Sequence, residues 1–460
     1  MSASSTLHIK PEEIDNPEKR GKYTVSIIGC GPIGVIHACA FAEAGFKVIC
    51  ADTDQNIISL LTKGKAPFSK HEIETKLKEY VKKRQINATS DIKIAVSQSN
   101  AILITMPIGI DEKKKTDYSS MEKTCELVGS SLQSGSVVVL ISIVGVGVME
   151  NTVKQVLENT SGFKVGTDFG LAYSPVRITQ GQTLEAITDY ERIIAALDKT
   201  SLNAASSLLE TISKKGVRKT NIMKMAEAAV LFEIVQQDVN TALTNEFSLL
   251  CEKIGLDYFV IQEFAKMNTS NMISSATLPI GIIQEEPYLL LEDAENLNSK
   301  LRTASIAREV NEELAKHAVN LARDALRSCG KTLTRARISL LGISQIPNER
   351  SPQKIMSKEL VKLLNSKGAK VSLYDPYFSD NVFVEMQHQI KKTLTETVEG
   401  ADCIMIVTGH DQFKRLGLRR LKALMKTPAA IIDLEGAFEP DKVEKEGLIY
   451  RGLGRGVWTR

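Results

Sequence analysis

Short apolar runs alternate with amphipathic stretches over the first part of the chain. Four of these runs are rich in Val, Ile, Leu and Ala, a composition typical of strands buried on both faces of a parallel sheet. Between the first two runs, residues 35–44 have the pattern of a helix. We therefore predict strands over residues 23–28, 47–51, 101–105 and 137–143, with helices between them. Strands that alternate with helices favour a parallel sheet.

The hydrophobic period then changes to that of a helix. Apolar side chains fall three or four residues apart over much of residues 215–253, which predicts one long amphipathic helix. A second helical stretch covers residues 305–327. The alternation then returns, with strands predicted at residues 337–341, 370–373, 403–408 and 430–433 and a helix at residues 351–365. The predicted fold class is α/β, with two Rossmann-like, doubly wound domains joined by the long central helix and a helical connector domain.

Composition and charge exclude several classes of protein. With 43% hydrophobic and 25% charged residues among 460, the chain is globular rather than disordered or fibrous. The 58 basic and 55 acidic residues leave a net charge of +3, too small and too evenly spread to favour a nucleic acid or an anionic membrane. The longest apolar run, residues 136–149, is shorter than the roughly 20 residues that cross a bilayer, and the polar N-terminus has no signal-peptide core. We expect a cytoplasmic protein with no nucleic-acid and no membrane partner.

Seven cysteines are scattered along the chain without a Cys-x-x-Cys pair. An odd, scattered set favours neither a disulfide framework nor a zinc site. We therefore expect reduced thiols, mostly in apolar surroundings, and no metal site.

A glycine-rich turn joins the first predicted strand to the first predicted helix. It reads Gly29-Cys30-Gly31-Pro32-Ile33-Gly34, and bare backbone in this pattern lets a pyrophosphate approach the positive end of a helix. Asp52 follows the second predicted strand, where a carboxylate accepts hydrogen bonds from the adenosine ribose and repels the 2′-phosphate of NADP. The turn, its helix and its acid together predict an NAD site. The alternative is a structural turn that holds no cofactor.

The chain as a whole resembles the nucleotide-sugar 6-dehydrogenases. The matching motifs are Val25 to Gly34, Asp52-Thr53-Asp54, Gly64-x-x-Pro67, Pro175-Val176-Arg177 with Gly181, Lys224 to Glu246, Ala307 to Asn311, Arg350-Ser351-Pro352, Tyr374 to Tyr377, Thr408-Gly409-His410 and Gly452 to Arg455. Enzymes of this family use NAD to oxidise C6 of a UDP- or GDP-sugar twice. The turn at Pro175 is similar to that of the branch acting on UDP-N-acetylhexosamines, which implies a role in polysaccharide precursor synthesis.

The resemblance implies a role for each matching position. NAD would be bound by Gly29, Gly31, Pro32, Ile33, Gly34, Asp52 and Ser142. The nucleotide sugar would be bound by Arg177, Asn245 and Arg350. The planar donors of Arg350 suit a pyrophosphate or sugar hydroxyls, and in the family this arginine reaches a substrate held mainly by another subunit. Lys224 would stabilise negative charge at the reacting carbon from a partly desolvated setting. Taken alone, Lys224 and Arg350 could equally be solvated side chains.

The family's organisation also implies how the chain is divided. We expect a flexible tail at residues 1–20, an NAD-binding domain at residues 21–205 and a central connector and dimerisation domain at residues 206–328. A C-terminal Rossmann-like domain that binds the nucleotide sugar would cover residues 329–460. The long helix of the connector implies a homodimer.

The sequence departs from the family at its reactive positions. A cysteine thiolate in the family captures the C6 aldehyde as a thiohemiacetal, which loses a second hydride and leaves a thioester for water to cleave. Here Ile282 occupies that position, and an isoleucine cannot attack an aldehyde. Other polar or conformationally special residues of the substrate loops are also replaced, at Met106, Ile108, Gly109, Ile143, Val176, Ala228, Pro279 and Ile280.

Three interpretations remain open. The protein could be a dehydrogenase that performs only part of the oxidation, an inactive NAD- and nucleotide-sugar-binding paralogue with a regulatory or partner role, or an enzyme with another substrate. We expect no substitute nucleophile, because Ser274, Ser275 and Thr277 have no evident base and Cys251 has the pattern of a core residue. We therefore predict loss of the full four-electron oxidation.

Overall fold

The computed structural model describes residues 7–67, 71–111, 113–176, 184–266, 285–348, 355–378 and 390–456. The chain forms two compact units, one of Met1–Val235 with Glu285–Lys300 and one of Gln236–Gln284 with Leu301–Arg460. Each unit is built on a largely parallel sheet covered by helices, which confirms the predicted α/β class. Among the described residues, no helix combines the length and the apolarity that a membrane crossing requires.

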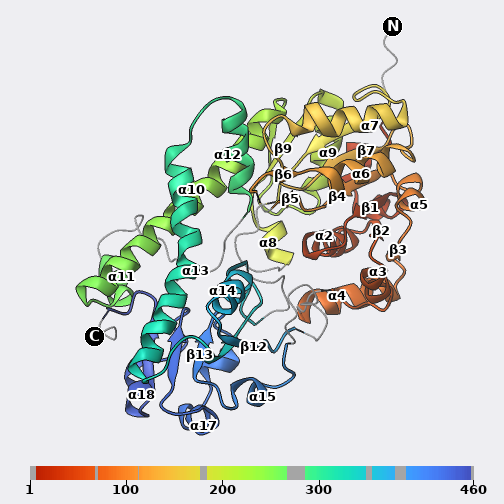
Figure 1. The fold of residues 1–460 in the computed structure, drawn as a ribbon. Helices are drawn as coiled ribbons and strands as arrows, with labels where there is room; N and C mark the ends of the chain where they lie inside the picture. Colours follow the sequence, from red (N-terminus) through yellow and green to blue (C-terminus); the bar gives the residue numbers. More distant parts are fainter. Residues whose placement is uncertain are drawn as a thin grey trace. The chain divides into compact units, whose positions relative to one another are not determined.

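The first unit contains an eight-stranded sheet, coloured red to yellow-green in Figure 1. Its strand order is β10-β9-β8-β7-β4-β1-β2-β3, and the pairing is parallel except between β8 and β9. The strands are β1 Thr24–Ile28, β2 Lys47–Ala51, β3 Ile86–Thr89, β4 Ala101–Ile104, β7 Val137–Leu140, β8 Gly170–Tyr173, β9 Arg192–Ala196 and β10 Val217–Thr220. A separate small hairpin pairs β5 Gly109–Ile110 with β6 Thr116–Asp117. The four strands predicted in this region are present, each within a few residues.

Both faces of this sheet are buried. Val25 and Ile27 of β1 pack into one apolar core, whereas the next residue, Ile28, packs into a second core on the opposite face. The helices that cover the sheet are α2 Pro32–Glu43, α3 Gln55–Thr62, α4 His71–Lys82, α5 Ile92–Ser97, α6 Ser119–Gly129, the π-helical turn η2 Met149–Val153, α7 Lys154–Ser161, α8 Leu184–Thr188 and α9 Lys199–Glu210. Helix α12 Pro287–Asn296 packs against β6 of the small hairpin. Double-sided burial explains why the strands read as continuous apolar runs rather than as alternating patterns.

The segment before β1 differs from the flexible tail predicted for residues 1–20. It forms α1 Pro11–Ile14 and the 3₁₀ turn η1 Pro17–Lys22, and the side chains of Leu7, Ile9 and Ile14 are buried in the first unit's core. The Arg20 guanidinium donates to the Ile14 carbonyl oxygen and ties the segment down. These apolar residues are isolated among polar ones, so no periodic pattern reveals them.

The long helix predicted over residues 215–253 begins later than expected. Helix α10 covers Met223–Ile254, and residues 217–220 instead form the edge strand β10. Gly216 has φ 77, a left-handed turn that favours glycine, and β-branched Val217 and Thr220 bound the strand that follows. The start of the predicted helix was therefore wrong, because a short edge strand with exposed polar residues resembles the polar face of a helix.

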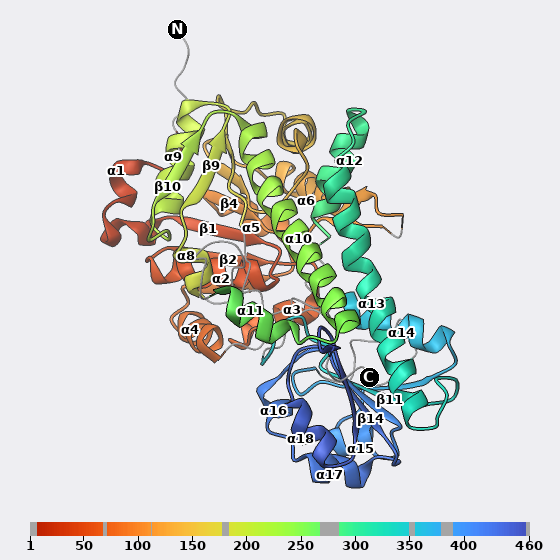
Figure 2. The ribbon, with the colours of Figure 1, turned by 90° about the vertical axis from the view of Figure 1, so that its left-hand side faces the viewer.

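The second unit contains a five-stranded parallel sheet with the order β12-β11-β13-β14-β15. Its strands are β11 Arg337–Leu341, β12 Lys370–Tyr374, β13 Cys403–Ile406, β14 Ala430–Asp433 and β15 Ile449–Gly452. Its helices are α11 Tyr258–Lys266, α13 Arg302–Ser328, α14 Ile355–Ser366, α15 Leu394–Val398, α16 Asp411–Lys414, α17 Leu418–Leu424 and α18 Pro440–Lys445, several of which are labelled around the blue sheet in Figure 2. Side chains of α13 and α14 fill the core on one face, and side chains of α16 and α17 fill the core on the other.

Candidate functional site

The glycine turn follows β1 at the C-terminal edge of the first sheet. The strands β2 and β4 lie on opposite sides of β1, so this edge is the switch point where doubly wound sheets bind ligands. Gly29 has φ 97, and a Cβ on Gly34 would lie 2.0 Å from the Gly29 carbonyl oxygen. A Cβ on Gly31 would instead meet no atom within 4 Å. Two glycines therefore close the turn against the helix, and the third leaves room above the first turn of α2.

Asp52 fixes this turn from the neighbouring strand. Its Oδ2 atom accepts a hydrogen bond from the Cys30 backbone N–H at 2.7 Å, and its Oδ1 atom accepts one from the Asp54 N–H at 2.9 Å. The side chain is partly exposed, and each carboxylate oxygen has a further lone pair for a ribose hydroxyl. The open backbone at Gly31, the helix start at Pro32 and the Asp52 carboxylate thus fit an adenine dinucleotide.

A buried histidine, His37, forms a hydrogen bond with the first turn of α2. Burial, with the Arg192 guanidinium nearby, lowers the pKa of His37 to about 3. Neutral His37 accepts from Arg192 through Nε2 at 3.1 Å and donates through Nδ1 to the Ile33 carbonyl oxygen at 2.8 Å. The Ile33 carbonyl oxygen is therefore occupied, and any contact with a cofactor would use the N–H or the half-buried side chain of Ile33.

The loop after β7 has its backbone amides held by side chains from three helices or their ends. Gly145 N–H donates to the Tyr118 hydroxyl at 2.9 Å, and Val146 N–H donates to Asp293 Oδ2 at 2.7 Å. Ser142, at the start of this loop, is buried, and its hydroxyl has no partner among the described residues. A buried hydroxyl without a partner at the edge of a dinucleotide-binding sheet fits a contact with the cofactor.

Glu227 of α10 completes the hold on this loop. Its carboxylate is fully buried and accepts from the Gly147 N–H at 2.6 Å and the Met149 N–H at 2.8 Å. Burial raises the pKa of Glu227, against the lowering effect of these two amides. The sequence does not reveal Glu227, Asp293 or Tyr118 as partners of the loop, because they lie far from it along the chain and no local pattern links them to it.

The corresponding edge of the second sheet carries a buried polar cluster. Asp375, directly after β12, accepts through Oδ2 from the backbone N–H of Ile343 at 2.8 Å and from the N–H and the hydroxyl of Ser344, each at 2.9 Å. The His410 ring lies 3.1 Å from the same oxygen. Although burial opposes it, hydrogen bonding from His410 and the backbone lowers the pKa of Asp375, so the carboxylate is ionised.

Three models of one family match successive parts of this chain. They describe the NAD binding domain, the central domain and the UDP binding domain of the UDP-glucose/GDP-mannose dehydrogenase family, and they match residues 23–213, 224–313 and 340–440. The chain belongs to the UDP-glucose/GDP-mannose dehydrogenase family. The match of the NAD binding domain confirms the cofactor predicted from the glycine turn and Asp52.

Individual relatives of this dehydrogenase family align over almost the whole chain. The UDP-N-acetyl-D-mannosamine dehydrogenase of Pyrococcus horikoshii is 29% identical over 438 residues, which cover 94% of this chain and 99% of that protein. A solved UDP-D-ManNAc dehydrogenase structure from Pyrococcus horikoshii has a TM-score of 0.82 at 27% identity and covers 94% of this chain and 100% of that one. The UDP-N-acetyl-D-glucosamine 6-dehydrogenase of Pseudomonas aeruginosa is 25% identical over 419 residues, 91% of this chain and 98% of that protein.

Lys224, predicted to stabilise charge at the reacting carbon, lies at the start of α10 beside the loop after β7. It lies in the first turn of α10, and its side chain is exposed. Within the first unit, α10 buries one charged side chain, Glu227. Its buried apolar side chains there are Met223, Ala226, Val230, Leu231 and Ile234. A Cβ on Gly147 would lie 3.6 Å from Lys224 Cε, so the lysine side chain extends along the loop after β7, and its role at the reacting carbon stays a prediction.

Asn245, predicted to contact the nucleotide sugar, lies in an internal network of the second unit. It is buried, and its Nδ2 atom donates to Asn311 Oδ1 at 2.9 Å. Asn311 in turn donates to Asp238 Oδ1 at 2.9 Å, and Arg308 lies 3.2 Å from the same oxygen. This network joins α10 to α13. Arg177, Ile282 and Arg350, the other predicted site positions, lie outside the described residues.

Every cysteine of the chain lies within the described residues and is buried as a free thiol. Burial raises the pKa of Cys39, Cys125, Cys251, Cys329 and Cys403, to about 12 at Cys125. The neighbouring Cys50 thiol, and then burial, raise the pKa of Cys30. Thiols of this kind are protonated and inert at neutral pH. Over the part of the chain that the structure describes, no group of His, Cys, Asp and Glu side chains could hold a metal ion.

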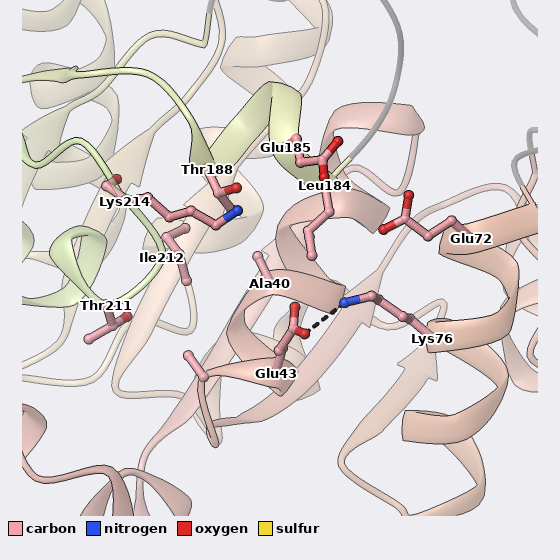
Figure 3. A pocket seen from close by; sticks show the side chains of 12 residues that line it. Ala40, Glu43, Glu72, Lys76, Leu184, Glu185, Thr188, Thr211, Ile212 and Lys214 are labelled. Atoms are coloured by element: carbon pink, nitrogen blue, oxygen red, sulfur yellow. Dashed lines mark hydrogen bonds and ion pairs between the residues drawn. The ribbon is translucent and has the colours of Figure 1, made fainter.

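A separate cavity of about 460 Å³ lies near the C-terminal end of α2, at the far end of that helix from the glycine turn. Side chains of α4, α8 and the segment after α9 line it together with Glu43. In Figure 3 the Lys76 ammonium points toward the Glu43 carboxylate, and the two lie 2.7 Å apart. The cavity is thus distinct from the dinucleotide site.

Proposed function

We propose that this member of the dehydrogenase family binds NAD and a UDP-N-acetylhexosamine but does not oxidise the sugar to the uronate. The observation that carries the proposal is the lack of an available thiol. Position 282 is isoleucine, and all seven cysteines are buried elsewhere. The dinucleotide turn, in contrast, keeps each feature that binding requires.

The missing thiol affects the two oxidation steps differently. Removal of one hydride and one proton from the C6 alcohol gives an aldehyde, and this step needs a hydride acceptor but no thiol. The second removal of hydride in the family starts from the thiohemiacetal that cysteine forms with the aldehyde. Without cysteine there is no thioester for water to cleave. A one-step oxidation to the aldehyde is the most that the described residues support.

The proposed substrate rests on the second unit and on the relatives. The UDP binding domain matches residues 340–440, and two of the relatives are named for UDP-N-acetyl-D-mannosamine and UDP-N-acetyl-D-glucosamine. Arg177 and Arg350 are the proposed contacts to the nucleotide sugar. We place the protein in the cytoplasm, with polysaccharide precursors as its ligands.

We also propose a homodimer that forms through the second unit. Leu243, Phe247, Leu250 and Ile254 of α10 are between 44% and 53% exposed, and their spacing places them along one face of the helix. Phe264 of α11 is 69% exposed. A contiguous exposed apolar face of this kind marks a protein interface. Light scattering on the purified protein tests this, with Phe247→Asp expected to give monomers.

The alternative function is that of an inactive NAD- and nucleotide-sugar-binding paralogue, and the replacements at Ile143, Val176 and Ala228 favour it. The test combines binding with turnover. Calorimetry should detect NAD and a UDP-N-acetylhexosamine, while NADH absorbance is followed with a panel of UDP-sugars. Aldehyde with one NADH per sugar supports the partial enzyme, and binding without NADH supports the paralogue. Absence of NAD binding would contradict the whole proposal.

A further inference from the structure

The loops after β11 and β13 meet at the edge of the second sheet where ligand binding is expected. The strands β12 and β13 lie on opposite sides of β11, so the connections leaving this edge diverge. The loops approach so closely that a Cβ on Gly342 would lie 2.4 Å from the Thr408 carbonyl oxygen. Thr408 Oγ1 donates to the Ser344 carbonyl oxygen at 2.7 Å and ties them together.

His410 follows Thr408 and reaches the far end of the β11 loop. Its Nδ1 atom accepts a hydrogen bond from the Asn348 backbone N–H at 2.8 Å, so Nδ1 carries no proton. Its Nε2 atom lies 3.1 Å from both Asp375 Oδ2 and the Ser344 hydroxyl, which makes Nε2 the protonated nitrogen. His410 is thus a neutral ring, fully buried, with both nitrogens in use.

The residue held by His410 is exposed and has an unusual backbone conformation. Asn348 has φ 62, and its Oδ1 atom accepts from the Asp411 N–H at 2.8 Å. Pro347 and Asn348 are exposed, whereas Ile343 and Ser344 at the start of the loop are buried. A buried side chain therefore dictates the shape of an exposed turn at the ligand-binding edge.

We propose that His410 is a positioning residue for the nucleotide sugar, because its Nδ1 atom holds the turn at Pro347 and Asn348 in the conformation that meets the nucleotide. The proposal rests on the proposed function, since it requires that this unit bind a UDP-sugar. His410 does not touch the ligand. Asp375 has a supporting role, because as an ionised acceptor it keeps the proton on Nε2 and leaves Nδ1 free to accept.

Two substitutions distinguish the roles of the two ring nitrogens of His410. In His410→Asn the side-chain oxygen can replace Nδ1 as an acceptor but no group reaches Asp375, whereas in His410→Gln an amide can reach Asp375 but nothing replaces Nδ1. Calorimetry with UDP is expected to give similar affinities for the wild type and His410→Asn. The affinity of His410→Gln should be about 10-fold weaker, the factor that loss of one ordinary hydrogen bond produces.

A purely structural role for His410 predicts a different pattern. Each variant loses one buried hydrogen bond, so thermal stability would fall in both and UDP affinity would follow stability. NAD affinity is the control, because NAD binds in the other unit, and it should be the same in all three proteins. Equal UDP affinity of the Asn and Gln variants would overturn the proposal. If the wild type binds no UDP, the proposed function fails and this inference fails with it.

An exposed pair of variants keeps the proposal testable if the buried substitutions prevent folding. Asn348→Gly retains access to the left-handed conformation and Asn348→Ala disfavours it, while both lose the same side-chain amide. The Ala variant should bind UDP more weakly than the Gly variant. Identical binding by these two variants would show that the shape of the turn is irrelevant to the nucleotide and would overturn the proposal.

Discussion

The carboxylate of Asp52 accepts the Cys30 backbone N–H at 2.7 Å, so the acid that suits an adenosine ribose also fixes the glycine turn. Cofactor choice and the geometry of the turn therefore depend on one side chain. This relationship links the two sequence features that predict NAD, and it makes their coupling measurable.

Asp52→Asn should weaken NAD binding through both roles. The amide group of Asn carries no charge and can accept through only one of its two terminal atoms. We expect NAD affinity to fall about 10- to 100-fold, because hydrogen bonds to charged groups contribute roughly 1.5–3 kcal/mol. Calorimetry with NAD and NADP checks this, and the preference for NAD over NADP should shrink. An unchanged preference would contradict the role of Asp52.

Gly31→Ala and Gly34→Ala should fail in different ways. A Cβ at Gly31 meets no protein atom, so Gly31→Ala should keep wild-type stability and lose NAD affinity because the methyl group occupies the space left for the pyrophosphate. A Cβ at Gly34 would lie 2.0 Å from the Gly29 carbonyl oxygen, so Gly34→Ala should unfold at a lower temperature. Thermal melts with and without NAD distinguish the two, and equal melting temperatures of the free variants would contradict the contact at Gly34.

Glu227 should make stability depend on pH in the direction opposite to an ordinary ion-paired carboxylate. Burial raises its pKa in the folded state, so the folded protein binds this proton more tightly than the unfolded chain does. The contribution to the free energy of unfolding is therefore fully present below the unfolded pKa and is lost as pH rises through the folded pKa. Burial also raises the pKa of Asp293, so this carboxyl group adds to the loss of stability as pH rises.

Glu227→Gln should remove part of this pH dependence. It should also lower the free energy of unfolding by roughly 1–3 kcal/mol, because a Gln amide cannot accept from both loop N–H groups. Chemical denaturation from mildly acidic to neutral pH measures both effects. Exposed Glu126→Gln is the matched control and should change neither. If the free energy of unfolding of Glu227→Gln changed with pH as steeply as that of the wild type, Glu227 would not titrate between mildly acidic and neutral pH.

Ile282→Cys alone should not restore oxidation to the uronate. The glycines that accompany the cysteine in the family are replaced by Pro279 and Ile280, and Val176 and Ala228 would remain. A free thiol at position 282 should still react with a thiol-specific reagent, which reports its presence independently of activity. Robust formation of uronate by this single variant would show that the other replaced positions do not prevent the reaction.

Sequence patterns identify those parts of the molecule whose physical cause is local. Strands buried on both faces appear as apolar runs. A glycine turn followed by an acid after the next strand can be recognised from neighbouring sequence alone. The sequence could not predict the hydrogen bonds from the loop after β7 to Glu227 and Asp293, or the one from Asn348 to His410. Each of these bonds joins segments that only the fold brings together.

The ratio of NADH to sugar product shows directly whether this protein stops before the uronate. Purified protein would be incubated with NAD and UDP-N-acetyl-D-mannosamine or UDP-N-acetyl-D-glucosamine, and the sugar product identified by mass spectrometry alongside the NADH released. We predict no uronate, with at most one NADH per sugar converted to the aldehyde. Two NADH per sugar together with the uronate would contradict this prediction.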